Sequence, residues 1–409
     1  MTAEIVIMND DAVAMASDSV VTIGTEDFDE KTYPSANKLF SISYDLPIGI
    51  MTYGNGKFMN ISWETLIKMY RTSSKKSFSN LKECVFDFIN FLENIREFDE
   101  EKQKNEILDN FSIFHYQILK NIISAIRYEN NGRQEDAEKS NLEKSNRLNQ
   151  PVENINTLIQ NILFDEIDNV KKSEPYFFIE KDFENDQQFL CNLREDFKEI
   201  LEKNYGKIYD TFKDLIDELT ESYFKHISDY NFSGIIISGF GSDEIFPKTY
   251  SLMMREIRNG KVVYTIEEKK GTGVYPFAQT DMVDLFMKGV SPETYANLCL
   301  AIENKFPDIC KDIFETMANS IDDDIDNTNQ LIENLPKSEL AFMAETLVNL
   351  TSFKRMFSIG METVGGPVDV AVISKGDGFI WIKRKHYFKP ELNPHFIAHY
   401  YNKRLEEQS

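Results

Sequence analysis

Residues 2–20 read TAEIVIMNDDAVAMASDSV and decide the fold. Two runs rich in small and β-branched residues, 3–8 and 12–23, flank a polar Asp-Asp turn, and this pattern predicts a β-hairpin. The numbers of facing residues in such a hairpin sum to about 20 or 21, because antiparallel strands pair residues directly opposite one another. Thr2 therefore lies opposite Asp18 or its neighbour.

Lys38 is a third polar residue at the edge of an apolar run. If Met1 is removed, Thr2 carries a hydroxyl and an α-amino group on one residue. An α-amino group titrates near about pH 7.7–8, so its neutral fraction can act as a base. Lys38 would lower the pKa of that amine, and Asp18 could hold Lys38 in place. The alternative is that all three are ordinary polar residues at strand ends.

The segment from Thr2 to Phe40 resembles the start of proteasome β-type subunits and of the bacterial HslV peptidase, which are N-terminal nucleophile (Ntn) hydrolases. The resemblance rests on these residues: Thr2, Ala12-Val13-Ala14-Met15-Ala16-Ser17-Asp18-Ser19 and Asn37-Lys38-Leu39-Phe40. It implies that Thr2 is the nucleophile and that Asp18 and Lys38 assist it. It also implies that a glycine-bearing turn after residues 47–53 donates a backbone N–H to the oxyanion. Gly54 is the choice for this role, with Tyr53 as the alternative.

The sequence departs from that family at two places. Val20 stands where many proteasome subunits carry Arg. Near Gly365, Glu362 or Thr363 would have to replace the Asp and Ser that the family places beside the catalytic amine. Gln279 and Thr280 also fall at a junction that approaches the nucleophile in that family.

Composition excludes several classes of function. The chain has 409 residues and a formal charge of −23, so its field repels nucleic acid and anionic membranes. No apolar stretch reaches the roughly 18–20 residues of a membrane span, and the N-terminus lacks the features of a signal peptide. The four cysteines are scattered, and no histidine is spaced with Cys or Glu as a metal site requires. We therefore expect a cytoplasmic protein with no metal and no cofactor.

The expected architecture is α+β, a four-layer αββα Ntn-hydrolase sandwich with an inserted helical subdomain. Its predicted parts are an N-terminal part of the Ntn-hydrolase domain at 1–74, an acidic helical insertion at 75–204, a C-terminal part at 205–386 and a polar tail at 387–409. The insertion is predicted from apolar residues recurring at three- and four-residue spacing. The acidic run Asp322-Asp323-Asp324 with Asp326 is expected to be a solvated loop, since it lacks the glycine and terminal glutamate of a calcium loop.

The predicted function is a threonine-type amide hydrolase, specifically a proteasome-like peptidase acting on a peptide or amide substrate. One alternative is an inactive Ntn-fold scaffold or sensor that binds a partner through its helical insertion. Another alternative is an Ntn amidase for a small amide. The expected partners are copies of the same chain and an ATPase or regulatory protein at the helical insertion, with neither nucleic acid nor membrane.

Overall fold

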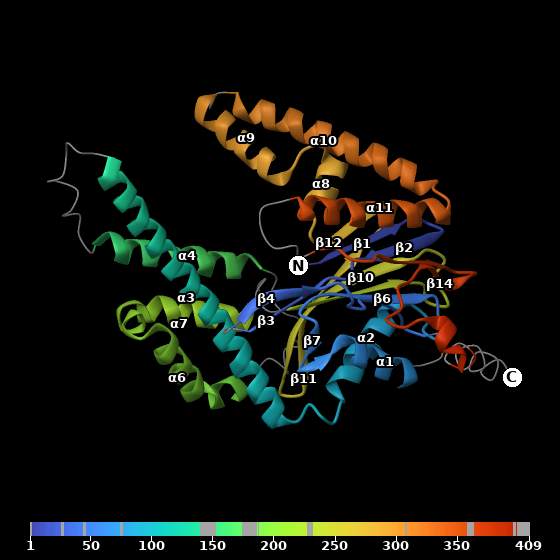
Figure 1. The fold of residues 1–409 in the computed structure, drawn as a ribbon, viewed down its shortest axis with the longest axis horizontal. Helices are drawn as coiled ribbons and strands as arrows, with labels where there is room; N and C mark the ends of the chain where they lie inside the picture. The colour runs from blue at the N-terminus through green and yellow to red at the C-terminus, as the bar shows by residue number, and fades with distance from the viewer. Residues whose placement is uncertain are drawn as a thin grey trace.

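A computed structural model gives the fold. It describes residues 2–25, 28–43, 46–73, 77–139, 153–173, 186, 188–226, 232–306, 309–357, 364–395 and 398. The chain is a mixed α/β protein, and the strands of these residues form antiparallel sheets with helices on either side (Figure 1).

The first large sheet contains the predicted hairpin. Its strands, in spatial order, are β12 (Gly273–Ala278), β1 (Ala3–Met8), β2 (Ala12–Ser17), β13 (Asp369–Ser374) and β14 (Gly378–Lys383). The predicted register is confirmed, because Glu4 pairs with Ser17 and the facing numbers sum to 21. The predicted second strand is too long, since β2 ends at Ser17. There Ser19 N donates to Gly365 O at 3.1 Å, which turns the chain away from the hairpin.

The second large sheet is assembled from two distant parts of the chain. Its strands, in spatial order, are β11 (Lys261–Lys269), β10 (Lys248–Arg258), β9 (Ser233–Gly239), β6 (Ile48–Gly54) and β5 (Leu39–Ser41). Asn259-Gly260, a pair typical of β-hairpin turns, joins β10 to β11. Two small ribbons complete the described strands: β3 (Val21–Thr25) with β4 (Phe28–Tyr33), and β7 (Lys57–Phe58) with β8 (Ile61–Ser62).

The two large sheets pack face to face. Val6 and Met15 of the first sheet share a buried apolar cluster with Met51 and Ile236 of the second. The approach is close at Gly49, where an added Cβ would lie 2.7 Å from the sulfur of Met15. The interior between the sheets is therefore as tightly filled as an ordinary protein core.

Helices cover the outer faces of both sheets (Figure 1). Helix α11 (Lys337–Met356) covers the first sheet, and α10 (Cys310–Glu333) contacts its edge strand β12. Helix α8 (Asp281–Lys288) packs against α10 and α11, and α9 (Pro292–Lys305) packs against α8 and α10. The helices on the second sheet are α1 (Trp63–Ser73) and α2 (Leu81–Glu93). Alternation along β1 sends Ile5 and Ile7 toward α11, and Val6 and Met8 toward the other sheet.

The acidic run at 322–326 is not a loop, so that prediction is wrong. It lies within α10, where Asp322, Asp323 and Asp324 are exposed. The run is flanked by Ile321 and Ile325, whose four-residue spacing continues the half-buried side of the helix. Carboxylates on the solvent side of an otherwise periodic helix do not interrupt it.

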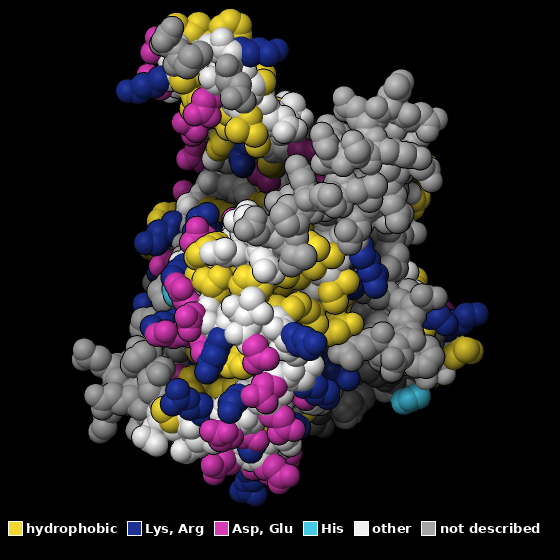
Figure 2. Space-filling view, turned by 90° about the vertical axis from the view of Figure 1, so that its left-hand side faces the viewer, with side chains coloured by type: hydrophobic (Ala, Val, Ile, Leu, Met, Phe, Trp, Pro, Cys, Tyr) yellow, Lys and Arg dark blue, Asp and Glu magenta, His cyan; other side chains and the backbone are white. Residues whose placement is uncertain are grey.

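A separate apolar core holds together the helices that project to one side of the sheets. These helices are α3 (Glu100–Lys139), α4 (Glu153–Lys172), α6 (Arg194–Tyr205) and α7 (Lys207–Lys225). Figure 2 views the molecule from this side, and there Lys, Arg, Asp and Glu side chains are intermixed over the lower part of the surface. That face therefore does not present a field of a single sign.

His115 lies at the centre of this helical core. Its Nδ1 is 3.0 Å from the Tyr205 hydroxyl and its Nε2 is 3.2 Å from the Thr220 hydroxyl. Burial lowers the pKa of His115 to about 3, because the charged imidazolium would lose its hydration.

We expect the helical core to lose stability in acid. A histidine with a lowered pKa contributes stability that is present above its ordinary pKa of 6.5 and is lost as the pH falls toward 3. At pH 5 the loss amounts to about 2 kcal/mol. Chemical denaturation between pH 7 and pH 5 measures it, and His386→Gln, at an exposed histidine, serves as the control. A free energy of unfolding that does not change over this range would contradict the prediction.

Helices α3 and α7 are joined to β10 through buried charges. A β-bulge between Met254 and Ile257 disturbs the pairing of β10 with β11, and Arg255 and Glu256 occupy it. Arg255 donates to Glu256 at 2.9 Å and Arg258 donates to it at 2.7 Å. The same carboxylate accepts from Asn110 of α3 at 3.1 Å. Burial opposes ionisation of Glu256, but the two guanidinium groups outweigh it and hold its pKa below the usual range.

Arg255 and Arg258 also reach the end of α7. Arg255 donates to Tyr223 O at 3.0 Å and Arg258 donates to Phe224 O at 3.2 Å. Their guanidinium groups lie over the rings of Tyr223 and Phe224, at 4.1 and 5.1 Å from the ring centres. This buried network is therefore a polar link between the helical core and the second sheet.

Candidate active site

Thr2 lies at the entrance of β1, beside the end of β12. Its carbonyl oxygen accepts a hydrogen bond from Gln279 N at 3.1 Å. The side chain lines a cavity of about 330 Å³ and is 8% exposed. The hydroxyl is therefore held in one place by the sheet and still borders open space.

Asp18 is the most firmly held carboxylate of the site. It is fully buried and follows β2 directly. One oxygen accepts from Ala3 N at 3.2 Å, and the other accepts from Val20 N at 3.3 Å and from Gly365 N at 3.0 Å. Backbone N–H groups from three parts of the chain therefore hold the carboxylate in this position.

The turn at Gly365-Gly366 lies against Asp18, and a side chain would not fit at Gly366. Gly366 has φ +74°, and an added Cβ would lie 2.8 Å from Cβ of Pro34. The glycine pair before β13 therefore serves the site, by placing a backbone N–H against Asp18. The neighbouring residues Glu362 and Thr363 lie outside the described residues.

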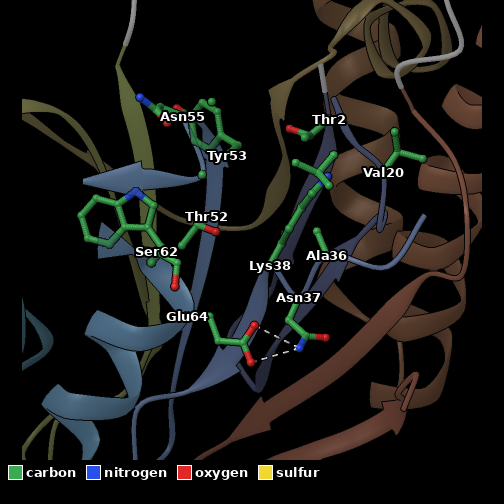
Figure 3. Close-up of a pocket in the computed structure, with 14 residues that line it drawn as sticks. Thr2, Val20, Ala36, Asn37, Lys38, Thr52, Tyr53, Asn55, Ser62 and Glu64 are labelled. Carbon is green, nitrogen blue, oxygen red and sulfur yellow. Dashed lines mark hydrogen bonds between the residues drawn. The ribbon is translucent and has the colours of Figure 1, made fainter. Parts of the chain in front are cut away.

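Lys38 contacts the Asp18 carboxylate from the second sheet. It directly precedes β5, and its carbonyl oxygen accepts from Thr52 N at 2.9 Å. Its ammonium group donates to Asp18 at 2.6 Å, and the side chain is 7% exposed. Figure 3 shows the Lys38 side chain extended along the cavity wall toward Thr2. The structure thus brings Thr2, Asp18 and Lys38 together, as the sequence predicts.

Gly54 lies on the same cavity, at the end of β6. It has φ +74°, and an added Cβ would lie 2.5 Å from Phe232 O, so only glycine fits there. Tyr53, Val20 and Asn55 also border the cavity (Figure 3). At its far end, Asn37 donates to both carboxylate oxygens of Glu64 at 3.3 Å, as the dashed lines in Figure 3 mark.

Glu4 is a site residue that the sequence analysis missed. It is fully buried on β1, and its Oε2 accepts a hydrogen bond from the Thr2 hydroxyl at 2.8 Å. Its Oε1 lies 3.9 Å from the Lys38 ammonium group. The sequence does carry a signal for this role. Glu4 is the one charged residue in an apolar strand, and a buried charge requires a partner.

No protein-family model matches this sequence, and no curated protein sequence matches it. Solved structures of Anbu proteins are similar to it. The helical assembly of the Anbu complex from Pseudomonas aeruginosa has 9% identity and a TM-score of 0.31, with 99% of this chain and 96% of that chain covered. Anbu, the ancestral beta-subunit, from Yersinia bercovieri has 9% identity and a TM-score of 0.30, with 98% and 96% covered. Anbu from a Hyphomicrobium species has 8% identity and a TM-score of 0.28, with 99% and 96% covered.

The family expected from the N-terminal motif is therefore wrong. The solved structures named above are of Anbu, which is proteasome-like but distinct from the proteasome β-type subunits and HslV. The physical reason is that a threonine, an aspartate and a lysine at strand ends describe a local arrangement, which is too short a pattern to identify a family.

Two further findings apply to the described residues alone. They contain no cluster of three or more His, Cys, Asp or Glu side chains that could hold a metal ion. None of their helices combines the length and apolar character needed to cross a bilayer.

Proposed function

We propose that this protein is a threonine-type amide hydrolase whose nucleophile is Thr2. The observation that carries the proposal is the position of the Thr2 hydroxyl, on the wall of a cavity of about 330 Å³ and beside the buried ion pair of Lys38 and Asp18. A hydroxyl nucleophile needs a nearby base and a substrate space, and such a position offers both.

In the proposed reaction the Thr2 hydroxyl attacks the amide carbonyl after Met1 has been removed. The α-amino group of Thr2 takes the hydroxyl proton and passes it to the leaving nitrogen as the C–N bond breaks, and the Lys38 ammonium group keeps that amine neutral. Asp18 holds Lys38 in place through their 2.6 Å contact. Gly54 N–H stabilises the oxyanion. Because glycine has no Cβ, a substrate can approach the backbone at this position. Water then hydrolyses the resulting ester.

We also propose that the protein has the architecture of an Ntn hydrolase. The face-to-face sheets with helices on both outer faces support a four-layer αββα Ntn-hydrolase sandwich formed by 1–74 and 205–386. The predicted insertion at 75–204 matches the separate helical core only in part, because α2 packs on the second sheet and α7, which follows residue 204, belongs to that core. The region 387–409 is then a tail.

The test is covalent labelling of Thr2. The purified protein is treated with a peptide epoxyketone, which reacts with both the hydroxyl and the amine of an N-terminal threonine, and its intact mass is measured. We expect the mass of the chain without Met1 plus one adduct. Thr2→Ala should remove the adduct, whereas Thr52→Ser, at a second threonine on the cavity wall, should retain it.

An unlabelled protein that retains Met1 would contradict the proposal and favour a scaffold without hydrolase activity. If labelling succeeds, a comparison of peptides with small amides as substrates identifies the substrate class.

A further inference from the structure

Glu4 lies beside the proposed nucleophile, but the reaction described above gives it no role. Its carboxyl oxygen is 2.8 Å from the Thr2 hydroxyl, the atom that would attack a substrate. Thr2 and Glu4 are two residues apart on one extended segment, so their side chains lie on the same face of the sheet. A carboxylate at this distance is within reach for direct proton transfer.

The charges around Glu4 do not balance if every group is ionised. Among the described residues, Lys38 is the only cation that forms an ion pair with Glu4, and its ammonium group lies 2.6 Å from Asp18 but 3.9 Å from Glu4. The second oxygen, Oε1, is buried and accepts no hydrogen bond from the described residues. One ammonium group therefore faces two buried carboxyl groups, and the less well paired of the two is Glu4.

This imbalance makes Glu4 a group that can exchange a proton near neutral pH. Burial raises the pKa of Glu4 to about 8, with Lys38 lowering it and Asp18 raising it. The Thr2 hydroxyl and the amino terminus of the chain also lower it. The residues paired with Glu4 in the sheet, Ser17 and Phe277, carry no charge.

We propose that Glu4 is a second catalytic base for Thr2, able to take the hydroxyl proton in place of the amino group, so that attack by the hydroxyl does not require that group. The inference rests on the hydrolase function proposed above. The Thr2 O–H proton passes to Glu4 as the bond from Oγ1 to the carbonyl carbon forms. Glu4 returns the proton to the leaving nitrogen as the C–N bond breaks. In the second half, Glu4 takes a proton from water as the water attacks the ester, and returns it to Oγ1 of Thr2.

The experiment distinguishes Glu4 from the amino group as the base by converting the amino group into an amide. The chain is produced with a cleavable N-terminal extension, so that Thr2 carries an amide in the uncut form and a free amine in the cut form. A β-lactone, which acylates a hydroxyl without needing an amine, is added to both forms. The acylation rate is followed by intact mass from pH 5.5 to 9.5.

We expect the uncut protein to be acylated, with a rate that rises as Glu4 ionises around pH 8. Glu4→Gln keeps the size of the side chain but cannot accept a proton, so the uncut variant should be acylated about 10²-fold more slowly and without this rise. Glu106→Gln is the matched control, because burial also raises the pKa of Glu106, to about 7, and it lies on α3 outside the cavity. This control should match the unmodified protein.

Thermal unfolding of both forms shows whether Glu4→Gln is folded. A carboxyl group with a raised pKa contributes stability that is present below its ordinary pKa of 4.5 and is lost as the pH rises through about 8. The variant should therefore unfold at the same temperature as the unmodified protein, or at a higher one, above pH 8.

Two results would overturn the role of Glu4 while leaving the hydrolase function intact. The first is acylation of the cut form alone, which would make the amine the base. The second is an uncut Glu4→Gln variant with an unchanged rate and pH profile. If neither form of the unmodified protein is acylated, the hydrolase function itself fails, and the role of Glu4 fails with it.

Discussion

Replacing Lys38 with methionine is expected to slow amide hydrolysis by about 10³-fold, because the substitution removes the cation beside the nucleophile. It should also lower the free energy of unfolding by about 3–5 kcal/mol, since a buried carboxylate that loses its partner is strongly destabilising. The carboxylate is Asp18, which Lys38 contacts at 2.6 Å in a site where both side chains are almost fully buried.

A double variant separates these two effects. Asp18→Asn combined with Lys38→Met removes both charges, so we expect the stability to recover in large part while hydrolysis stays slow. Lys57→Met, at an exposed lysine on β7, is the control and should change the free energy of unfolding by less than about 0.5 kcal/mol. A Lys38→Met protein with the normal rate of hydrolysis would remove Lys38 from the mechanism.

Replacing Glu256 with alanine is expected to destabilise the protein by about 3–5 kcal/mol. The substitution leaves the buried guanidinium groups of Arg255 and Arg258 without the carboxylate that both contact. It also removes the hydrogen bond from Asn110, so the link between α3 and β10 is weakened. The helices should therefore lose their attachment to the second sheet before the sheets themselves unfold.

Hydrogen exchange measures this uncoupling directly. We expect faster exchange in α3 and α7 of the Glu256→Ala variant and unchanged exchange in β1 and β2. Lys225→Met is the matched control, because it breaks the exposed pair of Lys225 with Glu221 on α7 and should cost about 0.5 kcal/mol or less. Equal acceleration of exchange in helices and sheets would show that the network does not act as a local link.

Much of the local structure could be predicted from the sequence because it depends on residues close together in the chain. The register of β1 with β2 follows from the short turn and from the side-chain alternation of the two strands. The contact of Asp18 with Ala3 N at the mouth of the hairpin follows from that register. Helix α1 begins after Ser62, a residue type favoured at helix starts, whose hydroxyl accepts from Thr65 N at 3.3 Å.

The acidic segment of α10 shows where a local rule fails. A run of aspartates has low helix propensity and predicts a loop. The helix forms nevertheless, because its half-buried residues pack against neighbouring helices and this packing outweighs the propensity of the exposed side. Propensity acts on single residues, whereas packing acts on the whole element.

The sequence by itself determined that Thr2, Asp18 and Lys38 stand at strand ends and that a hairpin brings the first two together. Only the tertiary structure decided the environment of this group. Gly365 reaches Asp18 from the far end of the chain, and Lys38 arrives from the opposite sheet. Glu4 becomes a candidate base only because the second sheet closes over it and excludes water, and burial of this kind depends on the whole fold.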